Sequence, residues 1–211
     1  MASLRHNPLL QAEARAPEGR ATGDDALLDA ARAGILAVGW RRTTLTDVAR
    51  RAGVSRMTIY RRWPDMQTLL ADLMTREWAV VVEDAALTAG ASPLQRLAGG
   101  VAATVTQLRR NELFAKILEV DPELLLPYLL DRRGRTQDAI LGLVEAVIAE
   151  GQADGSLRPG EPRLLARSLM LAAHGFALSM QTMTGAPDAP GPTEEELDRE
   201  LRTLVERYLR P

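Results

Sequence analysis

The sequence predicts an all-α protein with an N-terminal three-helix domain of the helix-turn-helix type, followed by a larger helical domain. Three observations support this prediction. Alanine and leucine are plentiful while aromatic residues make up only 4% of the chain, and Ala, Leu, Arg and Glu lose little freedom in a helix. Apolar residues recur at three- and four-residue steps, which is typical of amphipathic helices. Gly53 separates two short helical segments, as a tight interhelical corner requires.

The composition excludes several classes of site. The chain has 211 residues, of which 46% are apolar and 26% charged, as in ordinary globular proteins. It contains no cysteine, which excludes disulfides, thiolate metal sites and cysteine nucleophiles. Its first residues lack a basic segment followed by an apolar run, and no apolar stretch approaches the roughly 18 residues needed to span a bilayer. We therefore expect a cytoplasmic protein without a membrane partner, a metal or a cofactor.

Positive charge is concentrated near the N-terminus. Between Arg20 and Trp63 the chain has nine arginines and four aspartates, a net charge of +5, whereas the whole chain has a net charge of −2. The rest of the chain must then carry −7. A basic segment on an acidic body is typical of a nucleic-acid reader with a separate regulatory body. Chance clustering of solvated arginines would give the same count, so charge alone leaves both interpretations open.

The first helix is expected to follow a flexible arm over residues 1–22, which lacks a sustained apolar period. The helix is expected to begin at Asp24, because three aspartates then fall in its first turns, where the helix dipole favours negative charge. Gly39 ends it, and Trp40 is expected to fill the small core of this domain. The apolar stripe of the helix consists of Ala26, Leu27, Ala30, Ala31, Gly34, Ile35 and Val38.

Two short helices are expected next. Thr44 with Asp47 three residues later resembles a capping box, with Asp in place of the usual Glu or Gln. Gly53 lies just past the end of this helix, where a left-handed residue is needed. Ser55 is a good N-cap for the second helix. That helix ends before Pro64, because proline disfavours an α conformation in the preceding residue.

The rest of the chain is expected to be helical, with no convincing strand and no internal repeat. Asp65 caps a long linking helix over about 66–88, and Thr193 with Glu196 predicts a capping box at the last helix. The other helices are expected at 93–110, 112–120, 122–131, 135–153, 162–183 and 193–209. The predicted division is an arm over 1–22, a helix-turn-helix domain over 23–64 with the linking helix at 65–88, and a second helical domain over 89–211.

The stretch from Thr43 to Trp63 resembles the TetR/AcrR family of transcriptional regulators. The family has a first helix, a run like T-T-x-x-x-I/V-A-x-x-A-G-V-S-x-x-T-x-Y-x-x-F and a long linking helix. Met66 departs from the pattern, since family members often have a phosphate-contacting lysine near the start of the linking helix. The resemblance implies a TetR-like fold of about nine helices, whose C-terminal domain binds a ligand and dimerises. The dense match over 24–83 includes Thr43, Thr44, Val48, Ala49, Ala52, Gly53, Val54, Ser55, Thr58, Ile59, Tyr60 and Trp63.

On this resemblance the second short helix enters the major groove of double-stranded operator DNA by its N-terminal residues. Arg56 is the best candidate for reading a base, because a guanidinium can bind guanine O6 and N7 together. Met57 and Thr58 are candidates for contacts with base edges or a thymine methyl. Each exposed arginine has a solvated surface role as its alternative, and Tyr60 has core packing. The phosphate candidates are Thr44, Ser55, Tyr60, Arg41, Arg42, Arg61 and Arg62.

The resemblance further implies a homodimer in which the helices at 162–183 and 193–209 pair across a two-fold axis as a four-helix bundle. The first of these helices has more apolar surface than one core needs. The helices before them would enclose an apolar pocket for a small-molecule effector. The candidate lining residues, each with ordinary core packing as its alternative, are Met74, Trp78, Val101, Val105, Phe114, Ile117, Leu118, Leu141 and His174.

The implied function is that of a repressor that binds a palindromic operator as a dimer and is released by a small apolar or amphipathic ligand. Two alternatives remain open. An all-helical enzyme would need a catalytic constellation, and the sequence has no G-x-x-x-x-G-K-S/T loop, H-E-x-x-H or EF-hand pattern. Isolated carboxylates such as Glu119 and Asp121 indicate no chemistry. A helical protein-interaction module without DNA binding is the other alternative, and Met66 and the modest net charge favour it.

Overall fold

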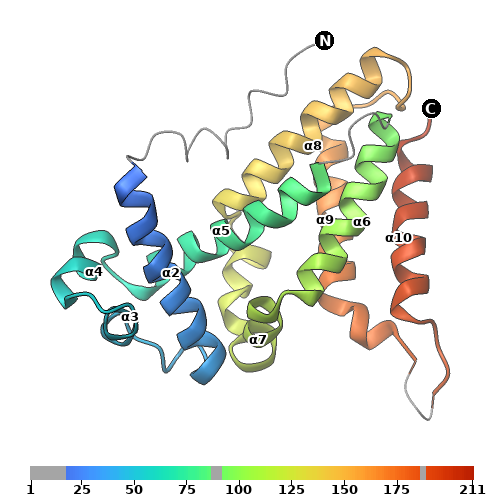
Figure 1. Ribbon diagram of the computed structural model, residues 1–211. Helices are drawn as coiled ribbons and strands as arrows, with labels where there is room; N and C mark the ends of the chain where they lie inside the picture. The colour runs from blue at the N-terminus through green and yellow to red at the C-terminus, as the bar shows by residue number, and fades with distance from the viewer. Residues whose placement is uncertain (1–17, 87–91, 186–188) are drawn as a thin grey trace. The chain divides into compact units, whose positions relative to one another are not determined.

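The computed structural model describes residues 18–86, 92–185 and 189–211. These residues form helices joined by turns and contain no β-sheet, which confirms the all-α prediction (Figure 1). The helices are α2 (Glu18–Val38), α3 (Leu45–Arg51), α4 (Arg56–Arg62), α5 (Met66–Ala86), α6 (Pro93–Arg110), α7 (Glu112–Val120), α8 (Arg135–Ala153), α9 (Pro162–Met183) and α10 (Glu194–Leu209), with a 3-10 turn η1 (Pro122–Leu124) and a π-helical turn η2 (Pro127–Asp131) between α7 and α8.

Two helix predictions were wrong. Helix α2 begins at Glu18 rather than Asp24, so Gly19 and Gly23 lie inside it, although each costs about 1 kcal/mol relative to alanine. The single helix expected at 122–131 is instead two short irregular turns, η1 and η2. Pro127 explains the break, because proline lacks the backbone N–H that a regular helix needs. The Arg132 N–H donates to the Pro127 carbonyl over 2.9 Å, which gives the wider π-helical turn.

The chain packs into two compact units. The first consists of Met1–Ala79 and Asn111–Ala139, and the second of Val80–Arg110 and Ile140–Pro211. The division at 23–64, 65–88 and 89–211 remains a prediction from the sequence, and the packing units follow another division because α7 packs with the N-terminal helices. The first unit has one core, to which α2, α3, α4, α5 and α7 contribute Leu27, Ala31, Ile35, Leu45, Val48, Ile59, Trp63, Leu69, Leu73, Leu113 and Ile117.

The second unit is built on α6, α8, α9 and α10, which share a core of their own. Helix α6 packs against both α9 and α10 (Figure 1). Gly151 on α8 allows a close approach, since a Cβ there would lie 2.4 Å from Leu157 Cγ. The predicted capping box of Thr193 and Glu196 at the start of α10 is confirmed. The core residues are Leu97, Ala98, Val105, Leu141, Ile148, Leu157, Leu165, Ala166, Leu169, Ala177, Leu201, Val205 and Leu209.

An ion pair between Arg109 and Asp198 joins α6 to α10 within this unit. The Arg109 guanidinium donates to both carboxylate oxygens of Asp198, over 2.9 and 2.8 Å. Thr106 Oγ1 donates to the same carboxylate over 2.9 Å. The Arg109 side chain is only 11% exposed and that of Asp198 22%. Two parallel hydrogen bonds in a partly buried place make this a strong pair whose loss would leave a charge without its partner.

We expect Arg109→Met to lower the free energy of unfolding by about 3 kcal/mol, because it strands the Asp198 carboxylate in a partly buried place. The double variant Arg109→Met/Asp198→Leu should lose less than the sum of the single variants, since no unpaired charge remains. Urea denaturation of the four proteins measures both effects. The control is Arg202→Met, which removes an exposed ion pair with Glu206 on α10 and should cost about 0.5 kcal/mol or less. Equal losses for Arg109→Met and the control would contradict the expectation.

Candidate nucleic-acid interface

Helix α3 begins at a side-chain cap that its own sequence supplies. Thr44 has an extended backbone, and its Oγ1 accepts a hydrogen bond from the Asp47 N–H over 3.2 Å. The same hydroxyl donates to Asp47 Oδ2 over 2.6 Å, and Arg50 donates to Oδ1 over 3.1 Å. These hydrogen bonds, that of Thr44 first, hold the pKa of Asp47 below its ordinary value. The Thr44 side chain is thereby fixed at the exposed start of α3.

The corner between α3 and α4 has the predicted helix-turn-helix geometry. Gly53 has a φ of +69°, the left-handed conformation that glycine adopts at least cost. The Val54 N–H donates to the Ala49 carbonyl over 3.0 Å, which closes the turn. Ser55 then caps α4, accepting from the Thr58 N–H over 3.1 Å. The left-handed conformation of Gly53 and the Ser55 cap were both predicted from residues a few positions apart, and both are confirmed.

The core side of α4 is firmly held. Ile59 is fully buried, and Trp63, which follows the helix, is 1% exposed. The Trp63 Nε1–H donates to Asp72 Oδ2 on α5 over 2.8 Å. Met66, where the TetR pattern often has lysine, is half-buried against the same core. Helix α4 therefore sits on α5 in a fixed orientation.

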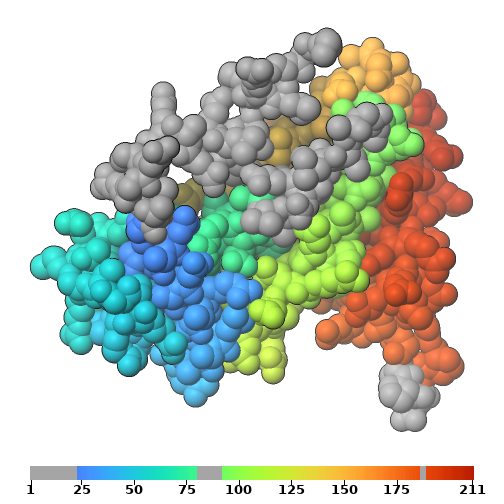
Figure 2. Space-filling view, in the orientation of Figure 1, coloured from blue at the N-terminus to red at the C-terminus, as the bar shows by residue number. Residues whose placement is uncertain are grey.

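The opposite side of α4 is open to solvent. Ser55, Arg56 and Arg61 are exposed, Met57 is 76% exposed and Tyr60 50%. Figure 2 shows the residues of α3 and α4 at the surface of the molecule, in the cyan and teal part of the colour scale. Thr58 is half-buried, and its hydroxyl lies 2.9 Å from that of Ser55. The N-terminal turn of α4 thus presents a cation, an apolar side chain and hydroxyls on one surface.

The four arginines expected at phosphates have different surroundings. Arg62 forms an ion pair with Asp24 over 2.7 Å and lies over the Trp63 ring. Arg41 is bonded to Glu123 and lies 3.5 Å from Asp121. Arg42 donates through Nε to the Val38 carbonyl over 2.8 Å. Among the described residues, by contrast, Arg61 and Arg56 have no hydrogen-bond or ion-pair partner.

Two further arginines line a cleft beside α3 and were not among the candidates from the sequence. A cleft of about 170 Å³ lies between α2 and α3, and Arg50 and Arg51 line it together with Arg42. Arg51 lies seven residues after Thr44 and so about two turns further along the same side of α3, which is the signal that could have found it, whereas Arg50 lies on another side of the helix. The cleft also contains Gly34, Val38, Thr43 and Asp47.

The nine residues proposed to line an effector pocket fall in both units. In the first unit Phe114 and Ile117 are buried, and the rings of Trp78 and Phe114 meet edge to face with centroids 5.9 Å apart. Met74 packs against the same core, and Leu118 is half-buried. In the second unit Val105 and Leu141 are buried with Val101 packed against them, and His174 on α9 is half-buried. Burial lowers the pKa of His174 below its ordinary value.

The two helices expected to dimerise keep large apolar side chains in solvent. On α9, Leu164 is 60% and Leu171 72% exposed, and on α10 Leu204 is 52% exposed. Leu164 and Leu171 are seven residues apart and therefore lie on one side of α9. The predicted ranges 162–183 and 193–209 correspond to α9 and α10.

Within the ranges 18–86, 92–185 and 189–211 no three His, Asp or Glu side chains come together as a metal would require. None of the helices in that part of the chain is both long enough and apolar enough to cross a bilayer.

Comparison with known proteins places this geometry in context. Residues 27–73 match the family model of bacterial regulatory proteins, tetR family. An uncharacterized HTH-type transcriptional regulator of Mycobacterium tuberculosis is 33% identical over 190 residues, which is 90% of this chain and 96% of that protein. A structure of a Rhodococcus protein of unknown function has a TM-score of 0.67 at 23% identity, covering 90% of this chain and 96% of that one. The transcriptional regulator FadR from Bacillus subtilis, in complex with stearoyl-CoA, has a TM-score of 0.63 at 17% identity, covering 85% and 96%.

Proposed function

Because the chain belongs to the TetR family of bacterial regulatory proteins and is a DNA-binding transcriptional regulator, we propose that it is a repressor that binds a palindromic operator as a homodimer. A small apolar or amphipathic ligand releases it from that operator. One observation carries the DNA-binding part of the proposal: the N-terminal turn of α4 is capped by Ser55, and Arg56 and Met57 in that turn are exposed to solvent. Such a turn can enter the major groove without rearrangement of the core.

The proposed contacts divide into base reading and phosphate binding. Arg56, which has no partner to give up among the described residues, reads a guanine. Met57 and Thr58 contact base edges or a thymine methyl. The phosphate contacts come from Thr44, Ser55, Tyr60, Arg42 and Arg61, whereas Arg41 and Arg62 would first have to leave their carboxylate partners.

The proposed dimer rests on the exposed leucines of α9 and α10. Apolar surface of this kind on two adjacent helices favours a second copy of the same chain, because a two-fold axis lets each patch cover the other. A dimer places two recognition helices about 34–36 Å apart, one turn of DNA, and so requires a palindromic site. Evidence against the dimer would therefore also be evidence against a palindromic operator.

The proposed effector is small and apolar or amphipathic. The candidate lining residues are apolar except for His174, and the structure of FadR from Bacillus subtilis, which has a similar fold, contains stearoyl-CoA. Helix α5 belongs to the first unit up to Ala79 and to the second from Val80, so a ligand that shifts it can change the spacing of the recognition helices. Operator binding must then weaken ligand binding by the same factor.

Selection of duplexes from the genome of the source organism by the purified full-length protein tests the proposal. We expect one enriched palindrome with half-sites about 10 base pairs apart, and a binding constant that falls steeply with salt. Enrichment of single, unpaired half-sites would contradict the dimer. Binding without any sequence preference would contradict the operator and favour a protein-interaction module.

A further inference from the structure

The buried carboxylate of Asp121 lies beside the turn that precedes α3, the first helix of the helix-turn-helix. Among the described residues the buried polar side chains are Thr43 and Asp121. Asp121 is only 2% exposed and lies at the C-terminal end of α7, about eighty residues after the turn that it contacts. Burying a carboxylate is costly unless the charge is well bonded, so its partners identify what it holds in place.

Asp121 holds the turn between α2 and α3. Its Oδ2 accepts a hydrogen bond from the Trp40 N–H over 2.8 Å, and its Oδ1 lies 3.5 Å from Arg41 Nε. Trp40 provides the first backbone N–H past the α2 end, since the Gly39 N–H still donates to the Ile35 carbonyl. Without Asp121 this amide would have no acceptor in a part-buried place. The free energy cost of such an unsatisfied donor exceeds the net stabilisation that an ordinary hydrogen bond gives.

The turn itself is closely fitted around this carboxylate. Gly39 has a φ of +83°, and a Cβ there would lie 3.3 Å from Asp121 Oδ2 and 3.2 Å from Val120 Cγ1. Thr43 closes the turn with two hydrogen bonds, from its N–H to the Trp40 carbonyl over 3.0 Å and from its hydroxyl to the Gly39 carbonyl over 2.8 Å. The next residue is Thr44, the cap of α3 and a proposed phosphate contact.

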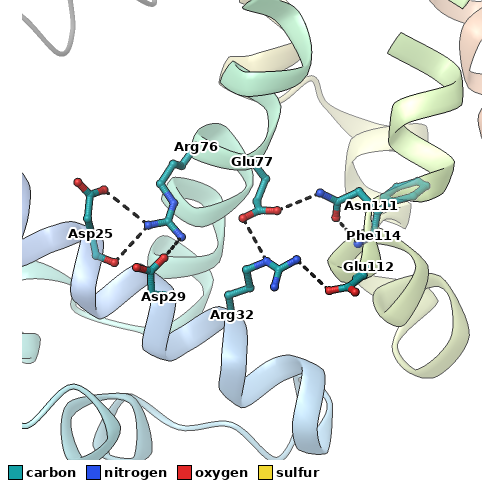
Figure 3. A network of polar contacts seen from close by, with 8 residues as sticks. All are labelled: Asp25, Asp29, Arg32, Arg76, Glu77, Asn111, Glu112 and Phe114. Carbon is teal, nitrogen blue, oxygen red and sulfur yellow. Dashed lines mark hydrogen bonds and ion pairs between the residues drawn. The ribbon is translucent and has the colours of Figure 1, made fainter. Parts of the chain in front are cut away.

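The other end of α7 is fixed in a similar way, by its N-terminal cap. Asn111 accepts from the Phe114 N–H over 3.0 Å and donates to Glu77 Oε2 on α5 over 2.9 Å (Figure 3). Arg32 on α2 bridges Glu77 and Glu112, at 3.4 and 3.2 Å. Both caps of α7 therefore make bonds outside α7, and the helix cannot slide along α2 without breaking them.

We propose that Asp121 is a positioning residue for DNA binding. By accepting from the Trp40 N–H it sets the conformation of residues 39–43 and so the place of Thr44 at the start of α3. This inference rests on the proposed DNA contacts and adds to them a residue that touches no DNA and lies outside the helix-turn-helix.

The test compares Asp121→Ala with Asp121→Asn in the full-length protein, on the selected operator. Asparagine keeps an oxygen that can accept from the Trp40 N–H, whereas alanine removes the acceptor. We expect Asp121→Ala to bind about tenfold or more weakly, with the slope of log K against log salt unchanged, because the contact that is lost is the uncharged Thr44 hydroxyl, which neutralises no phosphate. Asp121→Asn should stay within about threefold of the parent protein, since it keeps the acceptor.

The matched control is Ile148→Val, or Ile148→Ala, whichever lowers the melting temperature by as much as Asp121→Ala. Ile148 is fully buried in the core of the second unit, away from every proposed contact, so this variant should keep both the affinity and the salt slope. Parental affinity in Asp121→Ala, equal losses in the alanine and asparagine variants, or an equal loss in the control would each overturn this inference alone. Failure of the parent protein to bind any duplex would overturn the proposed function as well.

Discussion

Replacing Arg56 with alanine is expected to weaken operator binding by about 1–3 kcal/mol in each half-site and to relax the preference for one guanine. Arg56 is the first residue of α4, is exposed, and has no hydrogen-bond or ion-pair partner among the described residues. Its truncation therefore removes no hydrogen bond or ion pair among the described residues. A guanidinium that binds guanine O6 and N7 together contributes discrimination of this size. Binding of the variant to a library of operators with every base at each position measures both the affinity and the preference.

Arg61→Ala is the comparison that separates base reading from charge. Arg61 lies on the same helix and is likewise exposed without a partner in the described part of the chain. If Arg61 contacts a phosphate, its replacement should weaken binding to all sequences alike and lower the salt slope by about 0.9 for each protomer. Arg56→Ala should instead flatten one position of the specificity profile. If Arg56→Ala leaves every position unchanged, the base-reading role belongs to another residue.

Features that depend on neighbouring residues could be predicted from the sequence alone. Thr44, Ser55 and Thr193 each cap a helix by bonding to a residue three positions later. Gly53 is left-handed because the chain turns just past the end of α3, where glycine adopts a positive φ at least cost. The helix-turn-helix is built almost entirely from such short-range relations, which explains why its motif is recognisable in one sequence.

Features that depend on distant partners could not be predicted. The ion pairs of Arg41 with Glu123 and of Arg62 with Asp24 join residues far apart in the sequence, and no local pattern indicates them. Asp121 indicated no chemistry as an isolated carboxylate, and it becomes informative only when the fold brings it to Trp40, 81 positions earlier. The predicted start of α2 was also wrong. Acidic residues that favour a helix start at Asp24 do not prevent the helix from beginning earlier, at Glu18.

Leu171→Arg is expected to convert the protein from a dimer to a monomer. Leu171 is 72% exposed near the middle of α9, and a charge there would be buried without a partner at a two-fold interface. The same residue would appear twice across such an axis, so the two new arginines would also repel each other. Analytical ultracentrifugation measures the change directly, with the parent protein expected at twice the mass of the variant.

The same variant is expected to bind the full operator about 10²–10⁴-fold more weakly, because two half-sites no longer act through one linked molecule. Its affinity for an isolated half-site should be unchanged, since Leu171 and the exposed surface of α4 belong to different packing units. Leu130→Arg is the matched control: this leucine is 75% exposed on η2 in the first unit, and the same charge there should leave both mass and affinity as they were. If Leu171→Arg stays dimeric and Leu130→Arg does not, the two-fold contact lies on the first unit, and the leucines of α9 are surface residues without an interface.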